Sequence, residues 1–138
     1  MTCAILADGH AALAERLRDL LRAVSGTVLT VADSQSLLDG ARRLRPDLIV
    51  VDLGFGDEGI TKLLRQLTAD VPEARLIVLS LYDDPEIARA ALAEGADGVV
   101  VKRSIGDDLL EAIDRVLSGS TFVSPCFLAD PPAVYQQP

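Results

Sequence analysis

The sequence predicts an α/β domain in which five parallel strands form one sheet, in the order 2-1-3-4-5, with helices on both faces. Short apolar runs alternate five times with longer amphipathic segments, the links between them are short, and the third run is apolar up to its last residue. Strands that alternate with helices over short links form parallel sheets. A continuously apolar strand is typical of a sheet that is covered on both faces.

The apolar runs are the predicted strands, and each is only four or five residues long. They cover residues 3–7, 28–31, 48–52, 76–80 and 99–102. The run at 48–52 is the natural centre of the sheet because its first four residues are Leu-Ile-Val-Val. With its crossover helices, this pattern corresponds to a flavodoxin-like, doubly wound fold.

The segments after the runs carry apolar residues at three- and four-residue spacings, which predicts amphipathic helices. Asp33 and Ser34 are good N-caps for the second helix. Pro85 suits the first position of the fourth helix, and Asp83 and Asp84 are expected to cap that helix and interact with its dipole. Gly95 is expected to end it. A fifth helix is expected from about residue 107 to residue 117.

The repeating pattern stops after Gly119. The remaining residues contain several prolines and show no helical period: Pro125, Pro131, Pro132 and Pro138. We therefore predict one domain over residues 1–119 and a linker or tail over residues 120–138.

Charge and hydropathy exclude several classes of function. The net charge of −8 argues against direct binding to nucleic acid, whose phosphates would be repelled. The chain contains no apolar run of about 20 residues and no signal-peptide pattern. We expect a cytoplasmic protein that does not contact the membrane.

Four polar residues follow or end separate predicted strands. Asp8 follows the first strand, Asp52 ends the third, Ser80 ends the fourth and Lys102 ends the fifth. In an open parallel sheet these carboxyl ends share one edge, and ligands bind where the strand order reverses, here between strands one and three. Asp8 could instead be a simple helix cap, and Ser80 could be an ordinary turn residue.

This combination of side chains suits phosphoryl transfer. A carboxylate can be the nucleophile that accepts a phosphoryl group, and carboxylate oxygens are suitable ligands for Mg²⁺. A lysine and a hydroxyl can bind the phosphoryl oxygens. The segments ILADGH, IVVDLG, VLSLYDDPE and GADGVVVKRS resemble, in order and spacing, the signature segments of response-regulator receiver domains. The likeness covers about residues 3–118 and is greatest to receivers of LuxR/NarL-type transcription factors.

The resemblance implies that Asp52 is phosphorylated by a sensor histidine kinase or a phosphotransfer protein, and that Ser80 and Lys102 sense the phosphoryl group. It also implies Mg²⁺ held by Asp8, Asp52 and the backbone carbonyl of Gly54. Such a domain is not an ordinary enzyme, although receivers catalyse their own phosphorylation and its slow hydrolysis. A homodimer is implied by resemblance alone, and contact with DNA requires a separate output domain.

Three of the positions at which the sequence departs from the family pattern bear on metal binding and switching. Gly9 stands where receivers usually carry a second acid, so Mg²⁺ binding should be weaker. Leu81 replaces a small residue and could crowd Asp52, and Val99 replaces the aromatic residue of the usual switch. Asp57 or Glu58, in the loop after the third strand, is a candidate for the missing metal ligand.

Two alternative functions remain open from the sequence. A degenerate pseudo-receiver would act as a dimerisation or docking module without phosphorylation, which the three departures favour. A cobalamin-binding domain is a more remote alternative, because Asp8-Gly9-His10 is similar to that family's Asp-x-His segment. Leu13 stands where that family needs glycine. His10 by itself is more typical of a helix surface than of a ligand.

Overall fold

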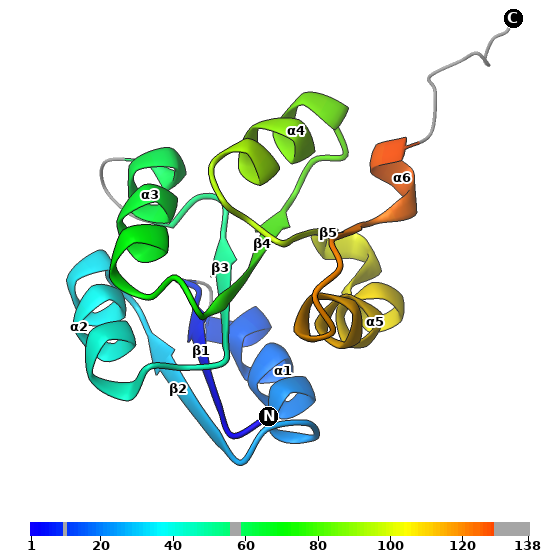
Figure 1. Cartoon of the computed structure of the whole chain (residues 1–138). Helices are drawn as coiled ribbons and strands as arrows, with labels where there is room; N and C mark the ends of the chain where they lie inside the picture. Colours follow the sequence, from blue (N-terminus) through cyan, green and yellow to red (C-terminus); the bar gives the residue numbers. More distant parts are fainter. Residues whose placement is uncertain (10, 56–58, 129–138) are drawn as a thin grey trace, which may run out of the picture.

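Strands and helices alternate along the chain in the computed structural model, which describes residues 1–9, 11–55 and 59–128 (Figure 1). The strands are β1 (Cys3–Ala7), β2 (Thr27–Val31), β3 (Leu48–Asp52), β4 (Arg75–Ser80), β5 (Gly98–Val101) and β6 (Phe122–Val123). The helices are α1 (Ala11–Arg22), α2 (Ser34–Leu44), α3 (Ile60–Asp70), α4 (Pro85–Ala93), the 3-10 helix η1 (Lys102–Ser104), α5 (Ile105–Leu117) and α6 (Pro125–Leu128).

The strands pair in parallel in the order β2-β1-β3-β4-β5-β6. The prediction of a doubly wound parallel sheet is therefore confirmed, but the count of five strands was one too few for the residues that the structure describes. The additional strand β6 is two residues long, which is too short for a period-2 pattern to reveal. It forms because Phe122 and Ser124 donate backbone hydrogen bonds to the carbonyls of Asp97 and Val99 on the exposed edge of β5.

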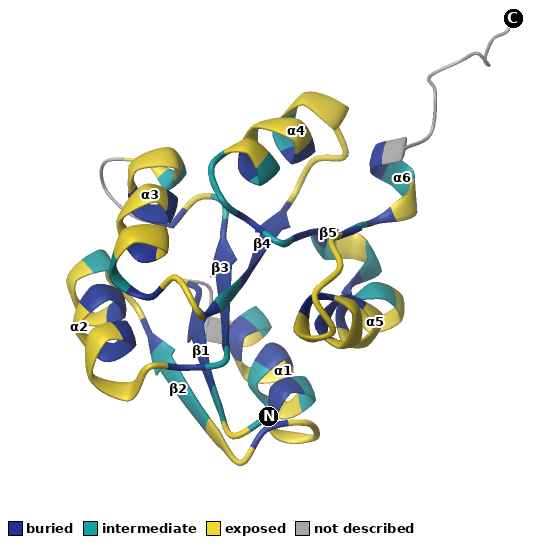
Figure 2. Ribbon diagram, viewed as in Figure 1, coloured by how far each residue is buried: buried dark blue, intermediate teal, exposed yellow. Residues whose placement is uncertain are grey.

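Helices cover both faces of the sheet. One buried cluster joins alternate strand residues to α2, α3 and α4, and a second joins the other residues of the strands to α1 and α5. Figure 2 shows β1, β3, β4 and β5 mostly buried and the edge strand β2 partly exposed, while the outer sides of the helices are exposed. This arrangement explains why the strands are apolar on both sides. None of the helices in the described ranges is long and apolar enough to cross a membrane.

Local sequence signals set the ends of the helices. The Asp33 carboxylate accepts a hydrogen bond from the backbone of Ser36 and caps α2, and Asp84 caps α4 with Pro85 in its first turn. Gly95 follows α4 with a φ of 108°, in the left-handed region that favours glycine. These three predictions are confirmed.

The C-terminal segment packs against both faces of the sheet edge. Phe122 in β6 belongs to the cluster with α1 and α5, and the guanidinium of Arg115 lies over its ring. Phe127 in α6 is 2% exposed and belongs to the cluster with α4. Within residues 120–138, for which the sequence predicted a linker or tail, the structure forms β6 and α6. Residues 129–138, with the prolines Pro131, Pro132 and Pro138, lie outside the described residues, as do His10, Asp57 and Glu58.

Candidate functional site

The two predicted carboxylates lie side by side because their strands are neighbours. β1 and β3 pair in a register that sets Ala7 against Val51, so the next residues, Asp8 and Asp52, take adjacent positions at the carboxyl edge of the sheet. Asp8 is 4% exposed and Asp52 is 6% exposed. Two nearly buried carboxylates at the point where strand order reverses are rare in a purely structural role, because each charge loses hydration.

Lys102 balances one of these charges. It follows the last residue of β5, and its Nζ lies 2.6 Å from Oδ1 of Asp52, with the side chains of both residues less than 10% exposed. Breaking such a buried pair from one side is costly, because the remaining charge is left without compensation. Asp8 adds a second, nearly buried carboxylate beside this pair.

The chain after β3 passes close to the other oxygen of Asp52. A Cβ built on Gly54 would lie 3.4 Å from Oδ2 of Asp52, and the backbone of Phe55 donates a hydrogen bond to the Asp52 carbonyl. The tight turn therefore sets the Gly54 backbone beside the carboxylate. A side chain at position 54 would narrow this space.

The donors suit Mg²⁺, which typically binds one or two carboxylates and keeps several waters. Asp8 and Asp52 carry hard oxygen ligands, and the backbone of Gly54 lies beside the Asp52 carboxylate. Among the described residues, no three acidic, histidine or cysteine side chains gather into a metal cluster. The additional ligands predicted at Asp57 or Glu58 fall outside that part of the chain.

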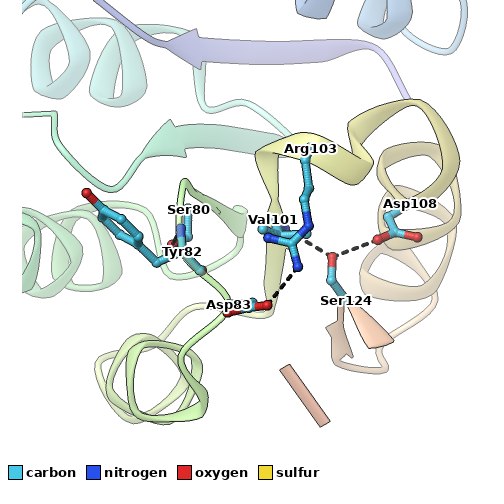
Figure 3. Close-up of polar contacts among 7 residues, drawn as sticks. All are labelled: Ser80, Tyr82, Asp83, Val101, Arg103, Asp108 and Ser124. Carbon is cyan, nitrogen blue, oxygen red and sulfur yellow. Dashed lines mark hydrogen bonds and ion pairs between the residues drawn. The ribbon is translucent and has the colours of Figure 1, made fainter. Parts of the chain in front are cut away.

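Ser80 reaches the same edge but its hydroxyl is bonded elsewhere. It is fully buried at the end of β4, opposite Val101, the residue before Lys102. Its Oγ donates to the carbonyl of Tyr82 at 2.8 Å and accepts from the Tyr82 backbone N–H at 3.1 Å (Figure 3). Ser80 must release the Tyr82 carbonyl before it can donate to a group on Asp52.

The loop between β4 and α4 is tied to the chain beyond β5. Asp83 accepts a hydrogen bond from Arg103 at 2.7 Å, next to Lys102 (Figure 3). This hydrogen bond lowers the pKa of Asp83 and raises that of Arg103. The prediction that Asp83 shares the capping of α4 was therefore wrong: Asp84 alone caps it, since Asp83 pairs across the loop.

The residues that depart from the family pattern lie in different environments. Leu81 and Tyr82 are 62% and 67% exposed, so most of the Leu81 side chain lies in solvent. Val99 is fully buried in β5, between Val78 of β4 and Val123 of β6. Gly9 is exposed, and a Cβ at that position would meet no atom within 4 Å.

One buried polar residue near the site was missed from the sequence. Ser124 is fully buried after β6; its Oγ accepts the backbone N–H of Val101 at 3.0 Å and donates to Oδ2 of Asp108 in α5 at 2.8 Å (Figure 3). A signal was present, because serine directly before a proline is a typical start of a helix, here Ser124 before Pro125. The proline-rich composition of the segment instead favoured a linker.

Comparisons with known proteins agree with this geometry. A family model described as the response regulator receiver domain matches residues 4–114. The chain is 31% identical over 124 residues to the methanol utilization control regulatory protein MoxX of Paracoccus denitrificans, covering 86% of this chain and 55% of the relative. It is 28% identical to the oxygen regulatory protein NreC of Staphylococcus haemolyticus, covering 86% and 56%.

A solved structure shows the same architecture. The crystal structure of a LuxR-family two-component response regulator from Aurantimonas sp. SI85-9A1 superimposes with a TM-score of 0.83 at 26% identity, covering 91% of each chain. The chain spans just over half the length of the two curated relatives described above.

Proposed function

Because the chain belongs to the response regulator receiver domain family, we propose that it accepts a phosphoryl group on the Asp52 carboxylate in a two-component signalling pathway. Receiver domains are signalling domains and not ordinary enzymes. The observation that carries the proposal is the buried contact of 2.6 Å between Asp52 and Lys102, beside the second carboxylate Asp8. The cytoplasmic location stays a prediction.

The proposed reaction is an in-line displacement at phosphorus. A carboxylate oxygen of Asp52 attacks the phosphorus of a phosphohistidine in a kinase or phosphotransfer protein, or of acetyl phosphate. The bond from phosphorus to the imidazole nitrogen, or to the acetate oxygen, breaks, and its electron pair leaves with that group. The product is an acyl phosphate on Asp52.

The surrounding residues act on charge and position. The Lys102 ammonium already contacts Oδ1 of Asp52, so it can pair with a phosphoryl oxygen as negative charge arrives. Bound Mg²⁺, held by Asp8, Asp52 and the Gly54 carbonyl, would neutralise charge on the transferring group. The Ser80 hydroxyl would exchange its bond to the Tyr82 carbonyl for one to the phosphoryl group, which frees the loop before α4.

The output of the switch is proposed to be a change in dimerisation or in the activity of a transcriptional regulator. MoxX and NreC are named as regulatory proteins, and the chain covers little more than half of each. With a net charge of −8 over its 138 residues, the chain is an unfavourable surface for DNA. Any contact with DNA is therefore assigned to a separate output domain.

A pseudo-receiver that docks or dimerises without phosphorylation is the second candidate. The fully buried Val99 favours it, because the sheet position of the family's switch aromatic holds a valine between two other valines. The cobalamin-binding alternative is not the family to which the chain belongs.

Intact-mass measurement after incubation with acetyl phosphate and Mg²⁺ separates the two candidates. We expect the wild type to gain one phosphoryl group, Asp52→Asn to gain none, and the exposed control Asp19→Asn to behave as wild type. A wild type that gains no mass with either acetyl phosphate or a phosphorylated histidine kinase would leave the docking module as the function. A gain that persists in Asp52→Asn would refute the assignment of the acceptor.

A further inference from the structure

The end of β5 is held by a residue from the C-terminal segment. Val101 is the last residue of β5, and Lys102 begins η1 immediately after it. The N–H of Val101 donates to the Ser124 hydroxyl, and that hydroxyl donates in turn to Asp108 in the first turn of α5. One buried hydroxyl therefore joins β5, α5 and the segment after β6 at the point where the chain turns toward Asp52.

We propose that Ser124 is a positioning residue for the Asp52–Lys102 pair, and that through Ser124 the C-terminal segment forms part of the phosphoacceptor site. This inference rests on the proposed function, because its rate readout is the transfer of a phosphoryl group to Asp52. Ser124 touches neither Asp52 nor the transferring group. It holds the backbone of Val101 and thereby fixes the backbone position of Lys102, the next residue.

The surroundings of Ser124 make it a rigid support. It is fully buried, and its hydrogen bond from the Val101 N–H lies away from water, where an unsatisfied partner is costly. The flanking residues are also fixed, since the Ser124 N–H donates to the Val99 carbonyl and Phe127 is anchored in the core. Without the hydroxyl, the Val101 N–H and the Asp108 carboxylate would both lose their partner in this contact.

The same contact couples the site to the end of the domain. The segment that carries Ser124 pairs with β5 through Phe122 and Val123 and then continues into α6, which packs near α4. Energetic coupling between two sites is reciprocal. If the docked segment positions Lys102, then a phosphoryl group that draws on Lys102 must change the stability of the docked segment. This route needs no aromatic residue at Val99.

The first experiment measures the rate of Asp52 phosphorylation by acetyl phosphate in folded variants. Ser124→Ala is expected to be about tenfold slower than wild type, the effect of one lost buried hydrogen bond. Ser124→Thr, which retains a hydroxyl, should recover most of the rate. Asp108→Ala removes the carboxylate that accepts the Ser124 hydrogen bond, from a partly buried position, and should also slow the reaction. This variant tests the same contact if the Thr side chain does not fit at position 124.

Ser25→Ala is the matched control. Ser25 is also a buried serine, and its hydroxyl donates to the backbone carbonyl of Thr27. It precedes the amino end of β2, whereas the acceptor site lies at the carboxyl ends of the strands. The rate of Asp52 phosphorylation in Ser25→Ala should stay within about twofold of the wild-type rate. Equal rates for Ser124→Ala and Ser25→Ala, or a Ser124→Thr variant as slow as Ser124→Ala in a folded protein, would overturn the positioning role.

A second measurement keeps this inference separate from the proposed function. The unfolding equilibrium constants of Ser124→Ala, Lys102→Ala and the double variant form a cycle that requires no phosphoryl transfer. Ser124→Ala should raise the unfolding constant in both backgrounds. We expect the factor to be roughly three to ten times larger in wild type than in Lys102→Ala. The control cycle of Ser25→Ala with Lys102→Ala should show additive effects. Additive effects of Ser124→Ala and Lys102→Ala would refute the coupling even if Asp52 is phosphorylated. Coupling without phosphoryl uptake would refute only the proposed function.

Discussion

Truncating Phe127 to alanine tests whether the C-terminal segment is a structural part of the domain. The ring is 2% exposed and packs in the cluster that includes α4. Truncating a fully buried phenylalanine commonly costs about 3–5 kcal/mol, from lost burial and from the cavity that remains. The cost is limited here, because α6 is one turn near the end of the described chain and can undock when its anchor is lost.

Undocking sets the upper limit of the effect. Ordering each residue costs about 1–2 kcal/mol, so the net docking free energy of the segment is a small difference between large terms. We therefore expect Phe127→Ala to lower the free energy of unfolding by about 2–3 kcal/mol. Deleting residues 120–138 should have nearly the same effect, because the truncated anchor and the missing segment both leave β5 as the edge of the sheet.

Urea-induced unfolding followed by far-ultraviolet circular dichroism is the suitable assay, since the chain has no tryptophan. Tyr82→Ala is the matched control: it truncates an aromatic residue that is 67% exposed and should change stability by less than about 0.5 kcal/mol. If Phe127→Ala were as stable as Tyr82→Ala, the segment would not be anchored as described. The reasoning about Ser124 would then fail as well.

Two further predictions concern the metal side of the site and the dependence of stability on pH. Gly9→Asp places a carboxylate where a Cβ meets no atom within 4 Å. It should lower the Mg²⁺ concentration that gives half-maximal phosphorylation by about tenfold, whereas an unchanged midpoint would show that position 9 lies out of reach of the metal. Asp47 accepts hydrogen bonds from the backbone N–H groups of Thr2 and Cys3 and from the Thr2 hydroxyl, which together lower its pKa. Its stabilising effect is therefore complete above the unfolded-state pKa of about 4 and is lost as the pH falls through the lower folded-state pKa. Asp47→Asn should cost about 1 kcal/mol at neutral pH and nothing at the acid end of a urea-denaturation series. A constant difference at every pH would contradict this explanation.

The sequence was sufficient for the parallel sheet and for the family. The strand of residues 48–52 is apolar up to Asp52, and only a sheet covered on both sides buries such a run. The caps Asp33 and Asp84 act within one helical turn, so their sequence signals needed no tertiary information. The receiver family, inferred from four ordered motifs, is confirmed by the family model over residues 4–114.

The candidate site was predictable in position but not in its contacts. The pairing of β1 with β3 places Asp8 beside Asp52, and the strand order of the doubly wound fold made these two strands neighbours. The present partner of Ser80, the Tyr82 backbone, depends on how one loop turns. Asp83 was assigned to a helix cap because that is the local choice, but the structure offers it Arg103, twenty residues away.

What the sequence by itself determined about this protein is the layered sheet and the edge at which its acidic and basic side chains meet, because periodic burial acts over short stretches of chain. Only the tertiary structure decided the last strand and the role of Ser124. A two-residue strand has no period of its own, and it exists because β5 presents unpaired backbone groups and the core has space for Phe127. Contacts of that kind depend on surfaces that form only after the rest of the domain has folded.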